Sequence, residues 1–189
     1  MLLRLSVVLF LAGISIAETA RCSLRFQRFT YADGLSDLTI NAIVQNSTGF
    51  LWIATHNGMN RFDSARFRIF LRDRTDSTSF VHDDVRQLLV DSRGTLWVGT
   101  SQGLCTYDPL RERFHRVRLS DSTTYVSEDI NGLVEDRDGF LWVAIAGGGV
   151  LRLDPRTHRF LRYVHDPSDS STLSSNTIGE LLLDRDAYL

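Results

Sequence analysis

Lysine is absent from this 189-residue sequence, and all 21 of its basic residues are arginines dispersed among 23 acidic residues. The formal net charge is only -2, and no stretch of the chain gathers positive charge. A protein that binds nucleic acid needs a concentrated basic surface to neutralise phosphates. The charge pattern therefore argues against nucleic acid as a partner of this segment.

Cysteine is scarce as well, with only Cys22 and Cys105 in the chain. Neither belongs to a C-x-x-C pair or to a His/Cys cluster, so we expect no metal and no other cofactor. A disulfide between the two is chemically permitted outside the cytosol, but two cysteines make no disulfide framework. We favour two unpaired thiols, with Cys105 packed in a strand.

One long apolar run is present, and it lies at the N-terminus. Residues 5–16 are largely apolar, follow Arg4, and end at the small-residue pattern Ser15-Ile16-Ala17. The run is shorter than the ~20 residues that span a bilayer as a helix. It predicts a secretory signal peptide over residues 1–17, and hence a periplasmic or otherwise extracytoplasmic protein.

The remaining sequence is a repeat marked by its three tryptophans, Trp52, Trp97 and Trp142, which recur every 45 residues. Each follows a glycine by three residues, and an asparagine or aspartate precedes that glycine by three. One tryptophan in a period of this length is typical of propeller blades. A fourth copy begins at Leu173, and its tryptophan would fall one residue beyond Leu189.

Each repeat contains four short β-rich segments separated by turn residues. The tryptophan segments follow Asx-x-x-Gly turns and precede tight turns, of which Asn57-Gly58 has the strongest hairpin signal. We predict an all-β fold, a partial β-propeller of four-stranded antiparallel blades with three blades and the start of a fourth. The predicted units are an orphan outer strand with its lead-in (24–35), blade 1 (36–79), blade 2 (80–124), blade 3 (125–172) and the start of blade 4 (173–189). The expected first strands are 40–45, 85–90 and 130–135, and the expected second strands are 50–55, 95–100 and 140–145. The third strands should end at residues 63, 108 and 154. The fourth strands should contain Phe67, Phe114 and Phe160, and Phe26 and Phe29 show the same spacing in the orphan strand.

The string from Asp91 to Thr100, Asp-Ser-Arg-Gly-Thr-Leu-Trp-Val-Gly-Thr, with Gly103-Leu104 and Tyr107-Asp108 after it, resembles the two-component regulator propeller repeat. The resemblance covers residues 24–189. It implies the periplasmic sensor region of a bacterial hybrid histidine kinase, anchored in the inner membrane through modules that lie further along such proteins. Relatives of this kind in Bacteroidetes often detect breakdown products of complex polysaccharides. The chain itself contains no kinase motif, so we expect it to bind and not to catalyse.

Candidate binding residues lie in the loops that enter the first strands and in those that join second to third strands, because propeller geometry places both on one face. The candidates differ from their repeat counterparts, and Arg86 stands where the other repeats have Asn41 and Asn131. They are His56, Asn57, His82, Asp83, Asp84, Arg86, Gln102, Glu128 and Asp129.

Three interpretations of this face remain open. The residues could bind a saccharide or similar extracellular ligand, or form a protein-interaction or homodimer surface without a small ligand, or simply be solvated loop tips. A fragment of a propeller-type polysaccharide-degrading enzyme is less well supported. The recurring aspartates are spaced as turn residues, and the five histidines share no repeat position.

Overall fold

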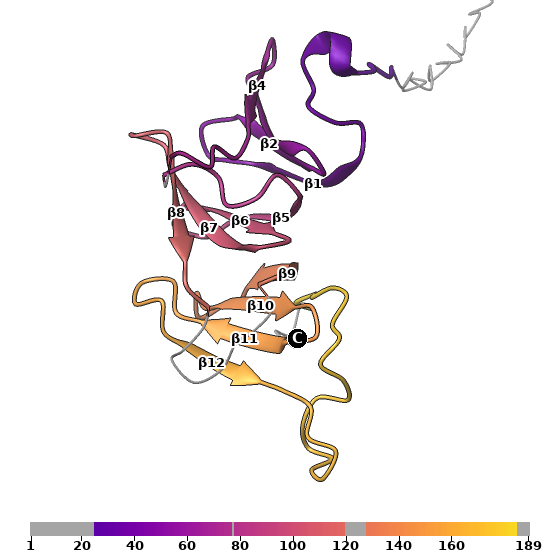
Figure 1. Cartoon of the computed structure of the whole chain (residues 1–189), viewed down its shortest axis with the longest axis vertical. Helices are drawn as coiled ribbons and strands as arrows, with labels where there is room; N and C mark the ends of the chain where they lie inside the picture. The colour runs from indigo at the N-terminus through magenta and orange to yellow at the C-terminus, as the bar shows by residue number, and fades with distance from the viewer. Residues whose placement is uncertain (1–24, 77, 120–127, 185–189) are drawn as a thin grey trace, which may run out of the picture.

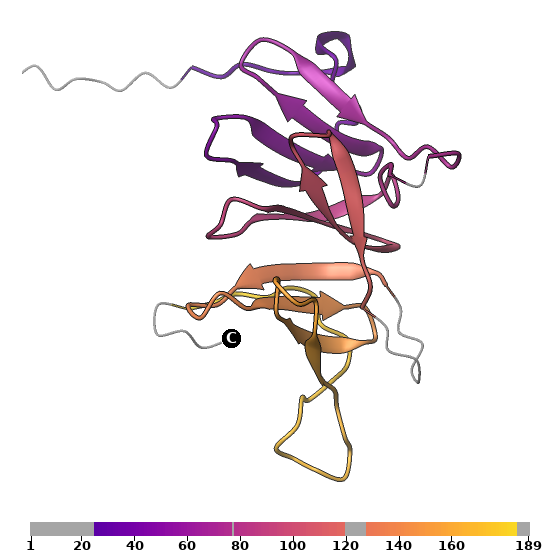
Figure 2. The ribbon, with the colours of Figure 1, turned by 90° about the vertical axis from the view of Figure 1, so that its left-hand side faces the viewer.

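The computed structural model describes residues 25–76, 78–119 and 128–184, and these form three four-stranded antiparallel sheets. The sheets stack one above another along the molecule, as Figures 1 and 2 show. Each is a meander in which neighbouring strands pair in chain order. The predicted all-β propeller architecture is confirmed. The strands are β1 (Ile40–Gln45), β2 (Leu51–Thr55), β3 (Gly58–Phe62) and β4 (Phe67–Phe70) in blade 1; β5 (Val85–Val90), β6 (Leu96–Thr100), β7 (Gly103–Asp108) and β8 (Arg113–Val117) in blade 2; and β9 (Ile130–Glu135), β10 (Leu141–Ile145), β11 (Gly149–Leu153) and β12 (Phe160–Tyr163) in blade 3.

The first strand of each blade lies where the sheets contact one another, β1 against β5 and β5 against β9. All three first strands have the predicted bounds. The second strands begin one residue later than predicted. In blade 1 the reason is that the backbone N–H of Phe50 donates to Asn46 Oδ1 at 3.0 Å, so Phe50 closes the turn before the strand begins.

Tryptophan side chains fill the spaces between sheets. Trp52 and Trp97 are each 1% exposed, and the ring of Tyr107 from blade 2 packs 4.8 Å from that of Trp52 in blade 1. A buried indole covers roughly 150 to 250 Å², which makes it a large part of each interface. Trp142 in blade 3 is only partly buried, because no further sheet covers it within the described residues.

The segment that begins the fourth repeat docks on blade 3 without forming a strand. Gly149 N–H donates to Asn176 O at 3.0 Å, and Asn131 Nδ2 donates to Ile178 O at 3.2 Å. Bonds of the same kind join blades 1 and 2 at Gly58 and Asn41. The segment thus takes the position of a first strand. Its backbone ladder is missing because residues 173–184 have no described second strand to pair with.

The predicted orphan outer strand at the N-terminus is wrong. Residues 25–30 form no strand, and Phe26 is 92% exposed. Phe29 instead packs on blade 1, its ring 5.1 Å from that of Phe62 and 5.5 Å from that of Phe67. An orphan outer strand would complete a sheet that lacks its own fourth strand, and each described sheet already has four strands. A short 3-10 helix, η1 (Tyr31–Asp33), follows.

Two sequence predictions lie partly or wholly outside the described residues, the signal peptide (1–17) and the state of Cys22. Cys105 is described, and its thiol is fully buried in β7, which confirms the prediction that it packs in a strand. Burial raises its pKa to about 12. The described residues include no helix long and apolar enough to cross a membrane.

Candidate ligand-binding face

The loops that enter first strands meet the turns between second and third strands on one face of the sheets, which we call the crossover face. Ser101 N–H donates to Asp84 O at 3.0 Å, and Ala146 N–H donates to Asp129 O at 2.9 Å. Gly58 N–H of blade 1 donates to Asp83 O at 2.6 Å. The loops that enter blades 2 and 3 are thus held by the turns of their own blades, and the loop of blade 2 is held by blade 1 too, which fixes the side chains they carry.

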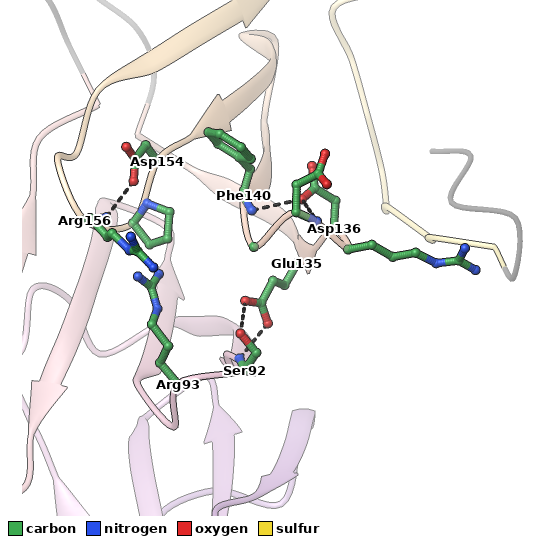
Figure 3. A pocket seen from close by; sticks show the side chains of 11 residues that line it. Ser92, Arg93, Glu135, Asp136, Phe140, Asp154 and Arg156 are labelled. Atoms are coloured by element: carbon green, nitrogen blue, oxygen red, sulfur yellow. Dashed lines mark hydrogen bonds between the residues drawn. The ribbon is translucent and has the colours of Figure 1, made fainter.

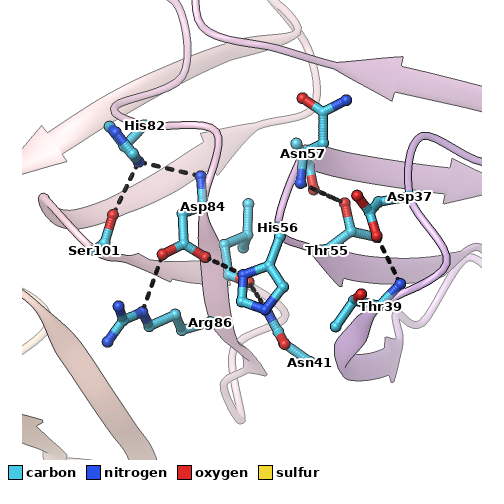
Figure 4. Close-up of polar contacts among 12 residues, drawn as sticks. Asp37, Thr39, Asn41, Thr55, His56, Asn57, His82, Asp84, Arg86 and Ser101 are labelled. Atoms are coloured by element: carbon cyan, nitrogen blue, oxygen red, sulfur yellow. Dashed lines mark hydrogen bonds and ion pairs between the residues drawn. The ribbon is translucent and has the colours of Figure 1, made fainter.

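A polar network on this face crosses all three blades. His56 Nδ1 lies 2.8 Å from Asp84 Oδ1, and Asp84 Oδ2 lies 3.3 Å from Arg86 Nε (Figure 4). Arg86 Nη1 lies 2.7 Å from Asp129 Oδ1 and 3.2 Å from Asn131 Oδ1. His56 belongs to blade 1, the Asp84–Arg86 pair to blade 2, and the last two residues to blade 3.

Arg86 occupies a position that has a structural task in the other repeats. Asn41 Nδ2 donates to Val85 O at 2.6 Å, and Asn131 makes the matching bond to the next segment. In blade 2 the neighbouring Gln87 takes over this task, because its Nε2 donates to Asn131 O at 2.8 Å. Arg86 is therefore not required for bridging the blades through a backbone carbonyl, and its side chain remains 34% exposed.

A cleft of about 340 Å³ opens beside Arg86. This volume lies within the ~300 to 1,000 Å³ range of small-molecule sites. The cleft is lined by Ile40, Asn41, His56, Arg86, Gln87 and Asn131. Its walls are mainly polar and come from the three first strands and one turn.

The guanidinium of Arg86 lies near two carboxylates, those of Asp84 and Asp129. Burial by itself would raise the pKa of Asp84, but hydrogen bonds from His56 and Arg86 outweigh it and hold that pKa below the usual value. Asp84 is consequently a carboxylate at neutral pH. The cleft lining presents N–H donors and oxygen acceptors side by side, from Arg86 and from the side-chain amides of Asn41, Gln87 and Asn131. Such mixed groups suit hydroxyl groups, which both donate and accept.

Four of the nine predicted site residues are brought together in this network, and His82 supports it. The Nδ1 of His82 lies 2.9 Å from Ser101 Oγ and accepts from the backbone N–H of Asp84 at 3.1 Å. Figure 4 shows this side chain between Ser101 and the backbone of Asp84. His82 therefore holds the loop in place and does not reach the cleft lining.

The other predicted residues are placed elsewhere. Asp83 Oδ1 accepts from the backbone N–H of Arg72 at 2.6 Å and so fixes the linker between blades 1 and 2. Glu128 pairs with Arg116, which also donates to Gln102 O at 3.2 Å. Asn57 reaches only Ser36 O, at 3.4 Å, on blade 1.

Sequence reasoning missed Gln87 as part of the site, although a signal existed. The repeats place Ala42 and Gly132 at its position, so a large polar residue there is an exception. Asn41 and Asn131 were considered only as counterparts of Arg86, yet both line the cleft. No group of three or more metal-ligating side chains occurs in the part of the chain that the structure describes.

Comparison with known families fits this geometry. The family model of the two component regulator propeller matches residues 34–57, 79–102 and 124–147, one match at each blade. The chain carries three two-component regulator propeller repeats. Each match runs from the loop that enters the first strand to the turn after the second strand, which are the segments that build the crossover face.

Relatives of this chain include a histidine kinase and extracellular domains of two-component systems. Histidine kinase P4 of Formosa agariphila is 36% identical over 74 residues, which are 39% of this chain and 5% of the kinase. Among solved structures, the extracellular domain of BT3049 from B. thetaiotaomicron, assigned to the hybrid two component systems, is 26% identical with a TM-score of 0.71. The match covers 81% of this chain and 22% of that domain.

The extracellular domain of BT4673 from the same organism supports the fold, at 22% identity and a TM-score of 0.67 over 82% of this chain and 20% of that one. The chain thus spans about a fifth of the solved domains that it resembles. It is a sensor-type propeller segment of the kind found in two-component systems.

Proposed function

We propose that this chain is the extracytoplasmic ligand-sensing segment of a two-component sensor, and that a saccharide or similar polar ligand binds in the crossover-face cleft beside Arg86. The extracellular placement of the related BT3049 domain supports the location. The apolar N-terminal run of residues 5–16 supports export. We assign no kinase activity to this segment, because in such sensors that activity comes from other modules.

The observation that carries the proposal is the exchange of tasks between Arg86 and Gln87. Gln87 makes the blade-to-blade bond that an asparagine makes in the other repeats. An arginine has therefore been accommodated at the cleft without loss of the bridge. A guanidinium held between two carboxylates offers fixed donors, and fixed donors and acceptors are what orient a polyhydroxylated ligand.

Signal transfer follows from the span of the network. Because the residues around Arg86 come from all three blades, a ligand bound there contacts all three at once. A ligand that fits one arrangement of the blades better than another shifts their populations by its differential affinity. Modules attached to the propeller would read that shift.

Ligand binding by the full chain and by Arg86→Gln tests the proposal. We would titrate a panel of neutral and acidic mono- and disaccharides by calorimetry and saturation-transfer NMR. At least one should bind, and Arg86→Gln should weaken it about tenfold or more, as expected for the loss of a charged hydrogen bond. Arg66→Gln is the matched control, because Arg66 is an exposed arginine in the β3–β4 loop of blade 1. Equal binding by Arg86→Gln and by the control would contradict the site.

Export can be tested separately with alkaline phosphatase, which folds to its active form only where disulfides form. A fusion to residues 1–189 should be active in bacteria, and a fusion that begins at residue 25 should be inactive. Activity that does not depend on residues 1–24 would contradict an extracytoplasmic location set by this leader.

Self-association is the second candidate, favoured by apolar side chains exposed at both ends of the stack. Ile43 is 57% exposed in blade 1, and Leu161 and Tyr163 are 61% and 41% exposed in blade 3. Light scattering of the full chain would show a concentration-dependent dimer, and Ile43→Glu should weaken it. A monomer at all concentrations would exclude this role for the isolated chain.

A further inference from the structure

A second cleft lies on the opposite face, which we call the turn face, where the turns between first and second strands meet those between third and fourth strands. It has a volume of about 510 Å³ and lies between blades 2 and 3 (Figure 3). Ser92 and Arg93 line it from the β5–β6 turn, Glu135 and Phe140 from the ends of the β9–β10 turn, and Arg156 from the β11–β12 loop. It shares no lining residue with the crossover-face cleft.

Each carboxylate in the lining is engaged by the protein itself. Glu135 accepts from Ser92 N at 2.6 Å and from Ser92 Oγ at 2.7 Å. Asp136 accepts from Phe140 N–H and from an indole N–H, each at 2.9 Å. Asp154 accepts from a backbone N–H at 2.8 Å and a threonine hydroxyl at 2.9 Å.

The exposed Asp138 completes the set, with Oδ2 3.6 Å from Arg152 Nη2. All the negative groups of the lining therefore have partners.

The lining has three arginines, Arg93, Arg156 and the exposed Arg137, and these are not matched in this way. Arg156 donates its backbone N–H to Asp154, and its charge helps to lower the pKa of that carboxylate, but its guanidinium makes no hydrogen bond or close ion pair within the described ranges. Arg93 Nη2 lies 3.9 Å from Asp91 Oδ2, an oxygen that already accepts from Trp97 Nε1 at 2.9 Å. Figure 3 shows the ends of the Arg93 and Arg156 side chains pointing toward each other across the cleft.

The fold does not require this arginine pair. The equivalent positions at the interface of blades 1 and 2 are Thr48 and Leu110, which carry no charge. Two like charges that face each other repel, and an anion between them converts the repulsion into two attractions. A guanidinium presents paired N–H donors whose spacing fits the oxygens of a carboxylate, sulfate or phosphate.

We propose that Arg93 and Arg156 form a binding site for an oxyanion group, a carboxylate or sulfate carried by an acidic solute. The cleft is far larger than the ~30 Å³ share of a water molecule and falls in the range of small-molecule sites, so a monosaccharide-sized solute can follow its anionic group into it. The site is independent of the ligand proposed for the crossover face. A sensor with both would take two chemically different ligands, or two parts of one extended ligand.

The test uses the full chain and three probes, which are sodium sulfate, D-glucuronate and the neutral D-glucose. Binding is followed by the NMR signals of arginine Nε–H groups. We expect sulfate or glucuronate to shift them with millimolar affinity, and glucose to leave these two arginines unaffected. Arg93→Gln and Arg156→Gln should each weaken binding at least about tenfold. Arg66→Gln serves as the control and should bind as the wild type does, because Arg66 lines neither cleft.

The probes also separate the sources of the anion. Glucuronate binding more tightly than sulfate would identify a solute site, whereas sulfate alone would identify an inorganic-ion site. Raising the sodium chloride concentration should weaken either interaction, since partly exposed charges are screened. Anion binding that persists unchanged in the Arg93→Gln/Arg156→Gln double variant, or no binding to the wild type, would overturn the proposal.

A charge-reversal variant guards against loss of binding through misfolding. Arg156→Glu places a carboxylate opposite Arg93, so the variant should lose anion binding while its melting temperature stays the same or rises. If Arg156→Glu binds the anions as well as the wild type, the site is not where we place it.

Discussion

The turn before the second strand contains an aspartate in blade 2 and an asparagine in blade 1, and the effect of this difference can be tested by a substitution. In blade 2, Asp91 Oδ1 accepts the turn N–H of Thr95 at 2.8 Å, while Oδ2 accepts Trp97 Nε1 at 2.9 Å. In blade 1 the residue is Asn46, whose Oδ1 serves the turn. Its other atom is an amide nitrogen, which cannot accept from an indole. The buried Nε1 of Trp52 accordingly has no partner within the described residues.

Asn46→Asp should supply that partner and stabilise the protein. An unpaired buried donor costs about 1 to 3 kcal/mol, and a hydrogen bond to a charged group contributes about 1.5 to 3 kcal/mol. Because residue 46 is partly exposed, the desolvation of the new carboxylate is modest. We expect a gain of about 1 to 2 kcal/mol, or roughly 2 to 8 °C in melting temperature for a chain of this size.

The assay is thermal and urea unfolding at neutral and acid pH, with Asp91→Asn as the mirror variant. Asp91→Asn should lose a similar free energy, because it leaves Trp97 Nε1 unpaired. The gain from Asn46→Asp should be present above the ordinary aspartate pKa of 3.8 and lost as the pH falls below it. The direction of the pKa shift expected for this aspartate follows from Asp136, its counterpart in blade 3. Burial by itself would raise the pKa of Asp136, but hydrogen bonds from Phe140 N–H, Trp142 and Arg152 outweigh burial and lower that pKa. An unchanged or less stable Asn46→Asp, with no loss in Asp91→Asn, would refute the reasoning.

Three further outcomes follow from the same structure. Gly149→Ala should destabilise by several kcal/mol, because φ is +76° and a Cβ would lie 2.2 Å from a backbone carbonyl oxygen. Gly139→Ala has a similar φ of +79°, but its Cβ would meet only Glu135 Oε1, at an ordinary 3.8 Å, so it should cost only about 1 kcal/mol; thermal unfolding of both compares them. With the other cysteine replaced by serine, Cys105 should resist thiol reagents at pH 8 until urea unfolds the chain, since its pKa is about 12; rapid labelling of the native protein would contradict its burial. Burial would raise the pKa of Asp84, but hydrogen bonds from His56 and Arg86 lower it, so ionised Asp84 stabilises the folded state above the ordinary aspartate pKa of 3.8. Part of the free energy of unfolding is therefore lost between neutral pH and pH 3, and this loss should be smaller in Asp84→Asn.

Strand positions could be predicted closely because the chain contains three copies of the same pattern, which can be aligned with one another. A tryptophan, a glycine three residues earlier and an Asx residue three before that fix a turn and the strand after it, whatever the neighbouring sequence. The same logic failed at Phe26 and Phe29. Their spacing imitates that of fourth strands, but an outer strand also needs a three-stranded sheet to complete, and each described sheet already has its four strands. Local spacing carries no information on that partner.

The candidate site was predicted only in part. Arg86 stood out because it breaks the repeat, and its network with His56, Asp84 and Asp129 lies where the loops were expected to meet. Asp83 and Glu128 looked equally exceptional, yet their side chains turn to a linker and to Arg116. The direction in which a loop carboxylate points depends on groups that are far away in sequence. The repeat pattern therefore could not separate loop residues that join the Arg86 network from those that point elsewhere.

The sequence by itself determined the architecture of this protein, since a 45-residue period with one indole per copy allows only units that bury their faces against one another. It also determined the turns, through Asx and glycine residues whose chemistry is local. Tertiary structure alone decided that Gln87 replaces an asparagine bridge and leaves Arg86 at a cleft. It alone brought Arg93 and Arg156, 63 residues apart, to one cleft between blades. The reason is that both features are contacts between blades, and such contacts depend on how neighbouring sheets stack and twist.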